Sequence, residues 1–283
     1  ALSELNELVG MENVKTEIDE LVHLIKYYND IGKDVLNKFS LHTIFTGNPG
    51  TGKTTVARIM GKIFKALGIL ERGHTVEVDR ESLVAGFIGQ TAIKTQQKID
   101  EALGGVLFID EAYALAEGGS GNDFGKEAIE VILKRMEDLR GQFVVFAAGY
   151  TDNMNVFLTS NPGLNSRFDK KLHFEDYTPE EMMKIALHYF SKEELTVTQD
   201  AKNHLIIYFT DIHKNRDKFF GNARTVRQTI SEAVKNQHLR MAKIAASLRN
   251  EQDIHSLLLE DVAEFSYQGN SLKRTVGFRL GGN

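Results

Sequence analysis

The fold of this chain is decided by the stretch Gly47-Asn48-Pro49-Gly50-Thr51-Gly52-Lys53-Thr54. The stretch fits the phosphate-binding loop pattern G-x-x-x-x-G-K-[ST], and it lies between a strand-like segment at residues 42–46 and a helical segment at residues 54–67, as that pattern requires. Its glycines let backbone N–H groups turn inward, and the start of the helix adds a positive dipole end. The sequence therefore predicts a loop that binds phosphate groups.

An acidic pair ends an apolar run further along the chain. Residues 106–109 are typical of a buried strand, and Asp110 and Glu111 follow directly. In a site of this kind Lys53 pairs with the β- and γ-phosphates, and the oxygens of Thr54 and Asp110 suit Mg²⁺. Glu111 lies one residue beyond the metal carboxylate, so we interpret it as the general base that activates the attacking water.

Taken singly, each motif has an ordinary structural interpretation. A turn rich in Gly and Pro before a helix is often only a turn, and an Asp-Glu pair after a strand often begins a helix. Both motifs in this order, with these flanks, favour a nucleotide site. Hydrolysis, as opposed to binding alone, depends mainly on Glu111.

The composition is that of an ordinary globular protein. The chain has 283 residues, of which 42% are hydrophobic and 26% charged, and this length suits one large or two modest domains. The formal net charge is −5, and no block rich in Lys and Arg is present. This balance argues against nucleic acid as a partner.

Residue usage narrows the chemistry further. The chain has no Cys, which excludes disulfides and thiolate metal sites and is typical of a reducing compartment. The nine histidines lack the paired helical spacing of zinc ligands. No apolar run approaches the length of a membrane span, and the N-terminus has no signal-peptide pattern, so we expect a cytoplasmic protein without a membrane partner.

The alternation of strand-like and helical segments predicts an α/β fold. A helical apolar pattern is formed by Val14, Ile18, Leu21, Val22 and Ile25. Amphipathic helical segments separate strand-like runs at residues 42–46, 75–79, 106–109, 143–148 and 171–174. We therefore expect a parallel five-stranded sheet flanked by helices, with ligands at the C-terminal ends of the strands.

A change of pattern near Tyr177 predicts a domain boundary. Thr178 as N-cap, Pro179 at the first helical position and Glu181 three residues after the cap predict a helix start. Helices are then expected at residues 179–189, 200–214, 223–246 and 259–265. We predict an α/β nucleotide-binding domain at residues 1–176, a small all-helical domain at 177–270 and a flexible C-terminal tail at 271–283.

Five segments together carry a family resemblance: GNPGTGKTT at residues 47–55, LFIDEAY at 107–113, AGY at 148–150, SNPGLNSRF at 160–168 and GNAR at 221–224. The set is similar to the AAA+ ATPase superfamily, and within it to the branch of stage V sporulation protein K and the red-type Rubisco activase. The resemblance covers Leu8 to about Ala246. It implies ATP hydrolysis, with ATP and Mg²⁺ as ligands and the helical domain as a lid.

The resemblance also implies individual binding residues. Val9 and Gly10 match the segment that lines the adenine pocket, although from the residues alone they are a loop valine and a turn glycine. Arg224 matches the sensor 2 arginine of the lid, and Arg227, one helical turn on, is the competing choice. The implied ATP-binding set is Val9, Gly10, Asn48, Pro49, Gly50, Thr51, Gly52, Lys53, Thr54, Thr55 and Arg224.

Arg167 matches the arginine finger that a neighbouring subunit presents to the γ-phosphate. Such a finger is worth about a thousandfold or more in rate. The alternative is an ordinary surface salt bridge. The catalytic set that the resemblance implies is Glu111, Arg167 and Lys53, with Thr54 and Asp110 as metal ligands.

The segment Phe87-Ile88-Gly89 matches the aromatic-hydrophobic-glycine pore loop of hexameric members. Exposing a large apolar pair is costly unless it grips a client, so a role in handling a protein substrate has physical sense. The alternative is that Phe87 packs into the core. The glycine-rich segment 117–123 is positioned like a second pore loop, or is only a connection.

One position departs from the family pattern. Many relatives have an Asn, called sensor 1, at the end of the fourth strand, whereas the aligned residue here is Tyr150. The Tyr150 hydroxyl or the Asn153 side chain could orient the attacking water instead, and the residues alone leave both open.

These features predict an ATP-driven machine that remodels proteins. We expect a homo-oligomer, in the form of a hexameric ring, that acts on a protein client through pore loops. The alternative function is an ATP-dependent switch or scaffold that threads nothing. A GTPase is disfavoured because the chain has no Asn-Lys-x-Asp motif, and no residue pattern identifies the client.

Overall fold

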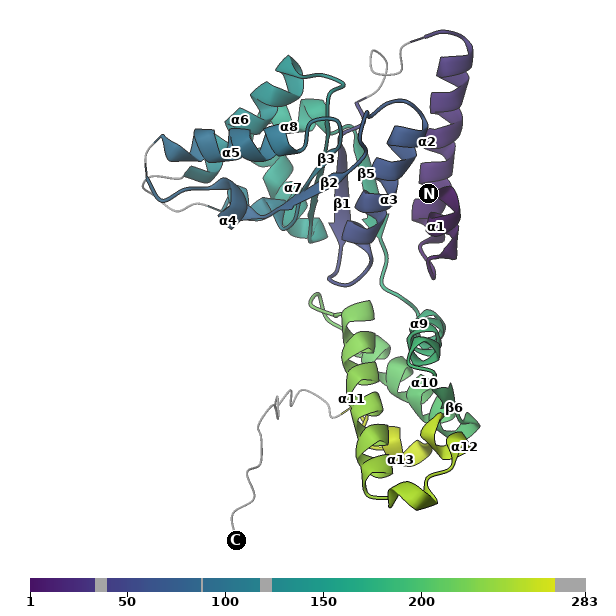
Figure 1. Ribbon diagram of the computed structural model, residues 1–283. Helices are drawn as coiled ribbons and strands as arrows, with labels where there is room; N and C mark the ends of the chain where they lie inside the picture. The colour runs from purple at the N-terminus through teal and green to yellow at the C-terminus, as the bar shows by residue number, and fades with distance from the viewer. Residues whose placement is uncertain (34–39, 88, 118–123, 268–283) are drawn as a thin grey trace. The chain divides into compact units, whose positions relative to one another are not determined.

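The computed structural model describes residues 1–33, 40–87, 89–117 and 124–267. These residues form two compact units (Figure 1). The first unit contains Ala1–Tyr177 and also Lys218–Thr225, and the second contains Thr178–Asp217 and the chain from Val226 onward. The chain therefore leaves the first unit after Tyr177, returns to it for a short stretch, and leaves it again. The tail predicted at residues 271–283 lies outside the described residues.

A five-stranded parallel sheet forms the centre of the first unit, which confirms the predicted α/β fold. The three middle strands are buried along their whole length, whereas the two edge strands are partly exposed, as expected for a sheet covered on both faces. The strand order is β2-β3-β4-β1-β5. The bounds are β1 (Thr43–Gly47), β2 (Thr75–Val78), β3 (Val106–Ile109), β4 (Val144–Gly149) and β5 (Lys170–Phe174).

Helices cover both faces of the sheet (Figure 1). One face packs against α1 (Leu2–Glu7), α2 (Glu12–Asp30) and α3 (Lys53–Ala66). The other packs against α4 (Arg80–Leu83), α5 (Gln90–Glu101), the 3₁₀ turn η2 (Ala112–Leu115), α6 (Phe124–Asp138), α7 (Thr151–Ser160) and α8 (Pro162–Arg167). The apolar pattern predicted for the first long helix is confirmed, because all five of its residues are buried in α2.

An aromatic layer joins three neighbouring strands on the α2 and α3 side. Because side chains alternate along a strand, Phe45 points to this side and Ile44 to the other. The ring centroid of Phe45 lies 5.0 Å from that of Phe146 and 5.2 Å from that of Phe174. These rings fix β1, β4 and β5 relative to one another.

The sheet order brings three loops to one edge. In parallel strands all carboxyl ends lie at the same edge of the sheet, which is where α/β proteins bind ligands. The phosphate loop follows β1, Asp110 follows β3, and Tyr150 follows β4, which lies between those two strands. The segments singled out in the sequence therefore meet at the carboxyl edge of the sheet.

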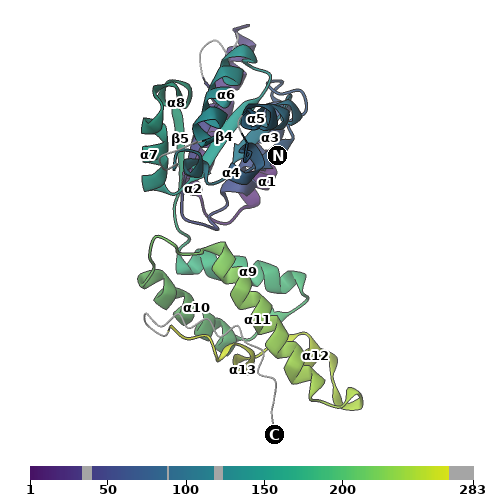
Figure 2. The same cartoon turned by 90° about the vertical axis from the view of Figure 1, so that its left-hand side faces the viewer.

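The second unit is mainly helical, as predicted (Figure 2). Thr178 and Glu181 form the predicted capping box, with Pro179 at the first helical position. Several helix ends differ from the sequence pattern: the first helix ends at Lys192 instead of residue 189, the third at Ala242 instead of 246 and the last at Val262 instead of 265. Two two-residue strands, too short for periodicity to reveal, also pair in parallel. The elements are α9 (Pro179–Lys192), β6 (Thr196–Val197), α10 (Gln199–Lys214), α11 (Ala223–Ala242), η3 (Ala246–Leu248), α12 (Glu251–Ile254), β7 (Ser256–Leu257) and α13 (Leu259–Val262).

No helix in the described part of the chain combines the length and the apolar character that crossing a membrane requires.

Candidate nucleotide-binding site

The phosphate loop needs glycine at positions where other residues would clash or be strained. Gly47, Gly50 and Gly52 have φ values of 143°, 72° and 96°, which L side chains rarely adopt. A Cβ on Gly50 would lie 2.2 Å from the carbonyl oxygen of Gly221 and 2.9 Å from the backbone nitrogen of Arg224. The loop therefore packs directly against the segment that returns from the second unit.

Lys53 is the first residue of α3, and its side chain folds back into the phosphate loop. Its Nζ donates hydrogen bonds to the carbonyl oxygens of Gly47 (2.8 Å) and Asn48 (2.7 Å). Burial lowers the pKa of Lys53 to about 8; the charge of Arg224 adds to this effect, whereas the carboxylate of Asp110 opposes it. The ammonium group thus stands in a partly desolvated cradle, where an anion would stabilise its charge.

A buried amide ties the loop to both places where the chain crosses between the units. Asp176 accepts hydrogen bonds from Asn48 Nδ2 (2.9 and 3.1 Å) and from Asn222 Nδ2 (2.8 Å). Asn222 Nδ2 also lies 3.2 Å from the carbonyl oxygen of Pro49, and its Oδ1 accepts the backbone N–H of Tyr177 (2.9 Å). Asn222 is fully buried with a φ of 48°, a left-handed conformation that Asn tolerates better than most residues.

Sequence reasoning missed Asp176 and Asn222. Asn222 lay within the GNAR motif, but the motif drew attention to its arginine. Asp176 carried no local signal, because its partners are far away in the sequence.

The predicted adenine segment lies beside the far end of the loop. Gly10 and Met11 both have left-handed backbones, with φ values of 67° and 60°. A Cβ on Gly52 would lie 3.2 Å from Met11 Sδ and 3.4 Å from the hydroxyl oxygen of Tyr177. Met11 and Tyr177 therefore belong to this end of the site although sequence reasoning did not select them.

The remaining predicted residues of the ATP-binding set lie in the phosphate loop, on the first turn of α3 and, for Val9, between α1 and α2. Thr51 is fully buried, and its hydroxyl donates to the carbonyl oxygen of Asn48 (2.9 Å). Val9 and Thr54 are half-buried, whereas Thr55 is exposed on the first turn of α3.

The acidic pair is exposed at the carboxyl end of β3. Glu111 has φ and ψ of 48° and 42°, a left-handed conformation that costs free energy in a residue other than Gly. Its backbone N–H donates to Asp110 Oδ1 (3.0 Å). The strained backbone holds the two carboxyl groups on successive residues at the end of a buried strand.

Tyr150 stands beside the acidic pair within an aromatic row. Its ring centroid lies 6.0 Å from that of Tyr113 and 6.1 Å from that of Phe219, the latter in an edge-on arrangement. Burial raises the pKa of Tyr150, the charge of Glu111 raises it further, and Arg224 opposes these effects. Asn153, the other sensor 1 candidate, instead donates to Glu117 Oε1 (3.2 Å).

The two candidate arginines of the helical lid occupy different surroundings. Arg224 belongs to the first unit, where its charge acts on Lys53 and Tyr150. Arg227 belongs to the second unit, where its Nε donates to the Tyr189 hydroxyl (3.1 Å). The structure therefore brings Arg224 to the phosphate loop.

Arg167 lies near the amino ends of the strands, at the side of the sheet opposite to the phosphate loop. It is the last residue of α8, and the Oγ of Ser40, which precedes β1, donates to its carbonyl oxygen (2.5 Å). Its charge also helps burial to lower the pKa of His42, next to the start of β1, to about 4. Its side chain pairs with Glu137, with an Nη2–Oε2 distance of 3.3 Å. Arg167 is thus remote from the phosphate loop of its own chain.

The predicted pore loop has an anchored base and an exposed tip. Phe87 is 72% exposed, so it does not pack into the core. At the base, Thr91 Oγ1 accepts the backbone N–H of Ala85 (3.0 Å), and Lys94 Nζ donates to the carbonyl oxygen of Val84 (2.9 Å). Gly89, exposed with a φ of 79°, is the N-cap of α5. Ile88 and residues 118–123 of the second candidate loop lie outside the described residues.

The residues present suit Mg²⁺ bound together with a nucleotide. No group of three or more His, Asp and Glu residues able to hold a metal occurs in the described ranges. Mg²⁺ in such sites needs few protein ligands, because phosphates and water supply the rest. The Thr54 hydroxyl at the start of α3 and the Asp110 carboxylate at the end of β3 provide oxygens of the required kind.

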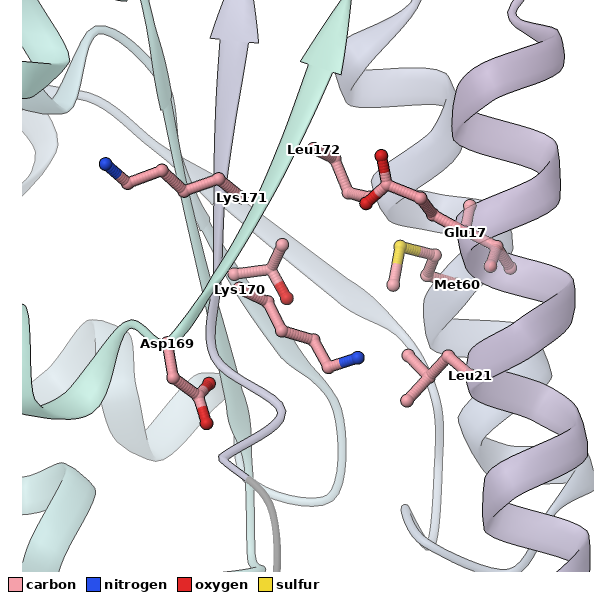
Figure 3. Close-up of a pocket in the computed structure, with 9 residues that line it drawn as sticks. Glu17, Leu21, Met60, Asp169, Lys170, Lys171 and Leu172 are labelled. Atoms are coloured by element: carbon pink, nitrogen blue, oxygen red, sulfur yellow. The ribbon is translucent and has the colours of Figure 1, made fainter.

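A cavity of about 230 Å³ lies elsewhere, between α2 and β5 (Figure 3). None of the predicted site residues lines it. Burial raises the pKa of Glu17 in its wall, and the nearby charge of Lys170 opposes this. The lining residues are Glu17, Ile18, Leu21, Thr43, Met60, Asp169, Lys170, Lys171 and Leu172.

Comparisons with known proteins match two consecutive parts of the chain. A family model described as "ATPase family associated with various cellular activities (AAA)" matches residues 43–176, and one described as "AAA lid domain" matches residues 178–271. Stage V sporulation protein K of Bacillus subtilis (strain 168) is 42% identical over 84% of this chain and 74% of that protein. The chloroplastic ribulose bisphosphate carboxylase/oxygenase activase of Cyanidioschyzon merolae (strain NIES-3377 / 10D) is 40% identical over 90% of this chain and 87% of that protein.

A solved structure supports the fold. The FIGL-1 AAA domain in complex with ADP superposes with a TM-score of 0.64 at 17% identity, covering 92% of this chain and 82% of that one. At this identity the likeness concerns the fold alone. The family models and the relatives show the family: the chain belongs to the AAA ATPases, and the resemblance seen in the sequence is confirmed.

The depressed pKa of Lys53 predicts that ATP binding takes up a proton at alkaline pH. In the free protein Lys53 is largely neutral above about pH 8, and bound phosphates raise its pKa. ATP affinity should therefore fall as the pH rises above this value. Calorimetry at about pH 8.5, where phosphate is fully ionised, in two buffers of different ionisation enthalpy measures the uptake. Lys53→Arg, which stays charged, is the control and should show none; equal uptake by both proteins would contradict the assignment.

Proposed function

We propose that this AAA ATPase is a ring-forming motor that remodels a protein client, with residues 1–176 as its nucleotide-binding domain and 177–270 as its lid. One observation carries the proposal: the groups suited to catalysis are divided between two edges of the sheet. Lys53, Glu111 and Arg224 stand at the carboxyl edge, and Arg167 stands at the amino edge. A single chain does not bring all four to one ATP molecule, whereas neighbouring subunits of a ring do.

Binding of ATP would use the loop and its surroundings. The triphosphate would lie against the inward N–H groups of Gly50 and Gly52, with Lys53 and Arg224 neutralising its charge. The nucleobase would lie beside Val9 and Gly10. Mg²⁺, held by Thr54 and Asp110, would neutralise charge on the phosphate oxygens.

Hydrolysis would use groups that already stand next to one another. Glu111 would accept the proton of the attacking water, and the Tyr150 hydroxyl would orient that water. Tyr150 suits this role better than Asn153, because the charges of Glu111 and Arg224 act on the pKa of its hydroxyl, whereas the Asn153 side chain donates a hydrogen bond to Glu117. Arg167 of the next subunit would stabilise the charge that develops on the γ-phosphate.

The client is proposed to be a protein. Phe87 offers an exposed aromatic ring on a loop with a fixed base, which suits gripping of an extended chain. The activase among the relatives takes its name from an enzyme, which supports a protein client for this chain as well. We further propose a hexamer and a cytoplasmic location.

Glu111→Gln should bind ATP with unchanged affinity but hydrolyse it at least about a hundredfold more slowly, because the general base is lost. A fluorescent ATP analogue and a phosphate-release assay measure the two quantities separately. Normal turnover by the variant would place the base elsewhere.

Tyr150→Phe should lower the maximal turnover by about tenfold or more, with little change in KM for ATP, because the ring contacts are kept and only the hydroxyl is lost. Asn153→Ala is the matched control and should keep full turnover. The reverse ranking of the two variants would assign the water-positioning role to Asn153.

Phe87→Ala distinguishes a threading motor from an ATP-dependent switch. In a motor, the Phe87→Ala variant should keep its client-free ATPase rate within about twofold. When Phe87→Ala is added to the Glu111→Gln variant, the double variant should no longer retain the proteins that co-purify with Glu111→Gln in the presence of ATP. Leu248→Ala is the control, since Leu248 is 74% exposed, close to the 72% of Phe87. Retention of the same proteins by both variants would favour a switch.

A further inference from the structure

The guanidinium group of Arg167 makes few close hydrogen bonds with the described residues of its own subunit, so its orientation depends on the contacts that remain. Its Nη1 lies 3.4 Å from the carbonyl oxygen of Gly163 and 3.5 Å from Ser166 Oγ, both long for hydrogen bonds. Its Nε is buried and has no hydrogen-bond partner among the residues described. Within the described part of the chain, the ion pair with Glu137 is its remaining polar contact with a side chain of another element.

The helices that carry this pair are packed against each other and against the core. Glu137 is in the last turn of α6, whose inner side is anchored in the core by residues such as Ile129, Ile132 and Met136. The α6 and α8 helices lie side by side (Figure 1). A Cβ on Gly163 would lie 3.0 Å from Leu133 Cδ1, so Gly163 allows a close approach of the two helices.

The two helices present matched pairs of residues to each other. Leu133 and Glu137 are four residues apart on α6, and Gly163 and Arg167 are four residues apart on α8, so each pair lies on one helical face. Contact of Leu133 with Gly163 thereby brings Glu137 next to Arg167. Ser40 fixes the end of α8 through the carbonyl oxygen of Arg167 itself.

From this arrangement we infer that Glu137 is a positioning residue for Arg167: it holds the guanidinium in the direction in which a neighbouring subunit needs it. The inference rests on the proposed function, in which Arg167 acts in trans. The Arg167 side chain is 27% exposed and Glu137 68%, so the pair lies at the surface, where a neighbour has access. A long side chain without such a contact samples many rotamers, and a transition-state contact is sensitive to small displacements.

The test separates the arginine from the site in which it acts. Subunits with Glu111→Gln have a disabled site and an intact finger, and subunits with Arg167→Ala have an intact site and no finger. In mixed rings the first should restore ATP hydrolysis in the second. Adding Glu137→Ala to the Glu111→Gln subunit should reduce the restored turnover by roughly tenfold, without changing KM for ATP, because the working site has native binding residues.

Two further variants exclude a merely structural effect. Glu130→Ala, at an exposed position of the same helix, should leave the restored turnover unchanged when it is added to the same subunit. Glu137→Gln, which keeps an acceptor oxygen but no charge, should give a turnover between those of Glu137 and Glu137→Ala. Nucleotide affinity and ring assembly of each variant are measured in parallel and should equal those of the parent.

The outcomes distinguish the inference from the proposed function. If mixed rings that carry Glu137→Ala reach a turnover equal to or higher than that of rings without it, the positioning role of Glu137 is wrong, while the role of Arg167 in trans is unaffected. Failure of the unmodified Glu111→Gln subunit to restore any turnover overturns the trans arginine, and the positioning role with it.

Discussion

The close contact between Gly50 and the returning segment Lys218–Thr225 is the constraint on which the rest of the structure depends. A side chain at Gly50 would collide with the backbone of Gly221, so the loop and the segment fit together only as they are. Asn222 and Asp176 then bond the loop to both crossings between the units, at Tyr177 and at residues 218–225. The phosphate loop is therefore bonded to both segments at which the chain passes between the units.

In the proposed motor, the sheet separates the ATP-binding residues from the arginine that would serve the neighbouring subunit. Strand β1 joins the phosphate loop at one end to Ser40 and His42 at the other, where Ser40 holds the backbone of Arg167. The free energies involved show what the ion pair with Glu137 can do. An exposed ion pair contributes at most about 1 kcal/mol, whereas an arginine finger lowers the activation free energy of hydrolysis by about 4 kcal/mol or more. Such a pair can direct Arg167 without preventing it from engaging a phosphate.

Much of the fold and of the phosphate-binding site could be predicted from the sequence, because the features that determine them are local. The phosphate loop and the buried strands are local patterns, in which glycine spacing and runs of apolar residues fix the backbone, and the capping box at Thr178 is likewise contained in four residues. The links among Asn48, Asp176 and Asn222 were not predictable, because they join positions distant in the chain. The choice between Tyr150 and Asn153 depended on surroundings that only the fold supplies, namely the acidic pair for one and Glu117 for the other.

The central claim is that one chain binds ATP but needs a neighbour to cleave it. The most direct test measures ATP affinity and turnover per subunit over a range of protein concentrations, with the assembly state determined by mass at each one. The account predicts an affinity that changes little and a turnover that rises with the fraction of assembled subunits. A turnover per subunit that stays constant down to the monomer would contradict it.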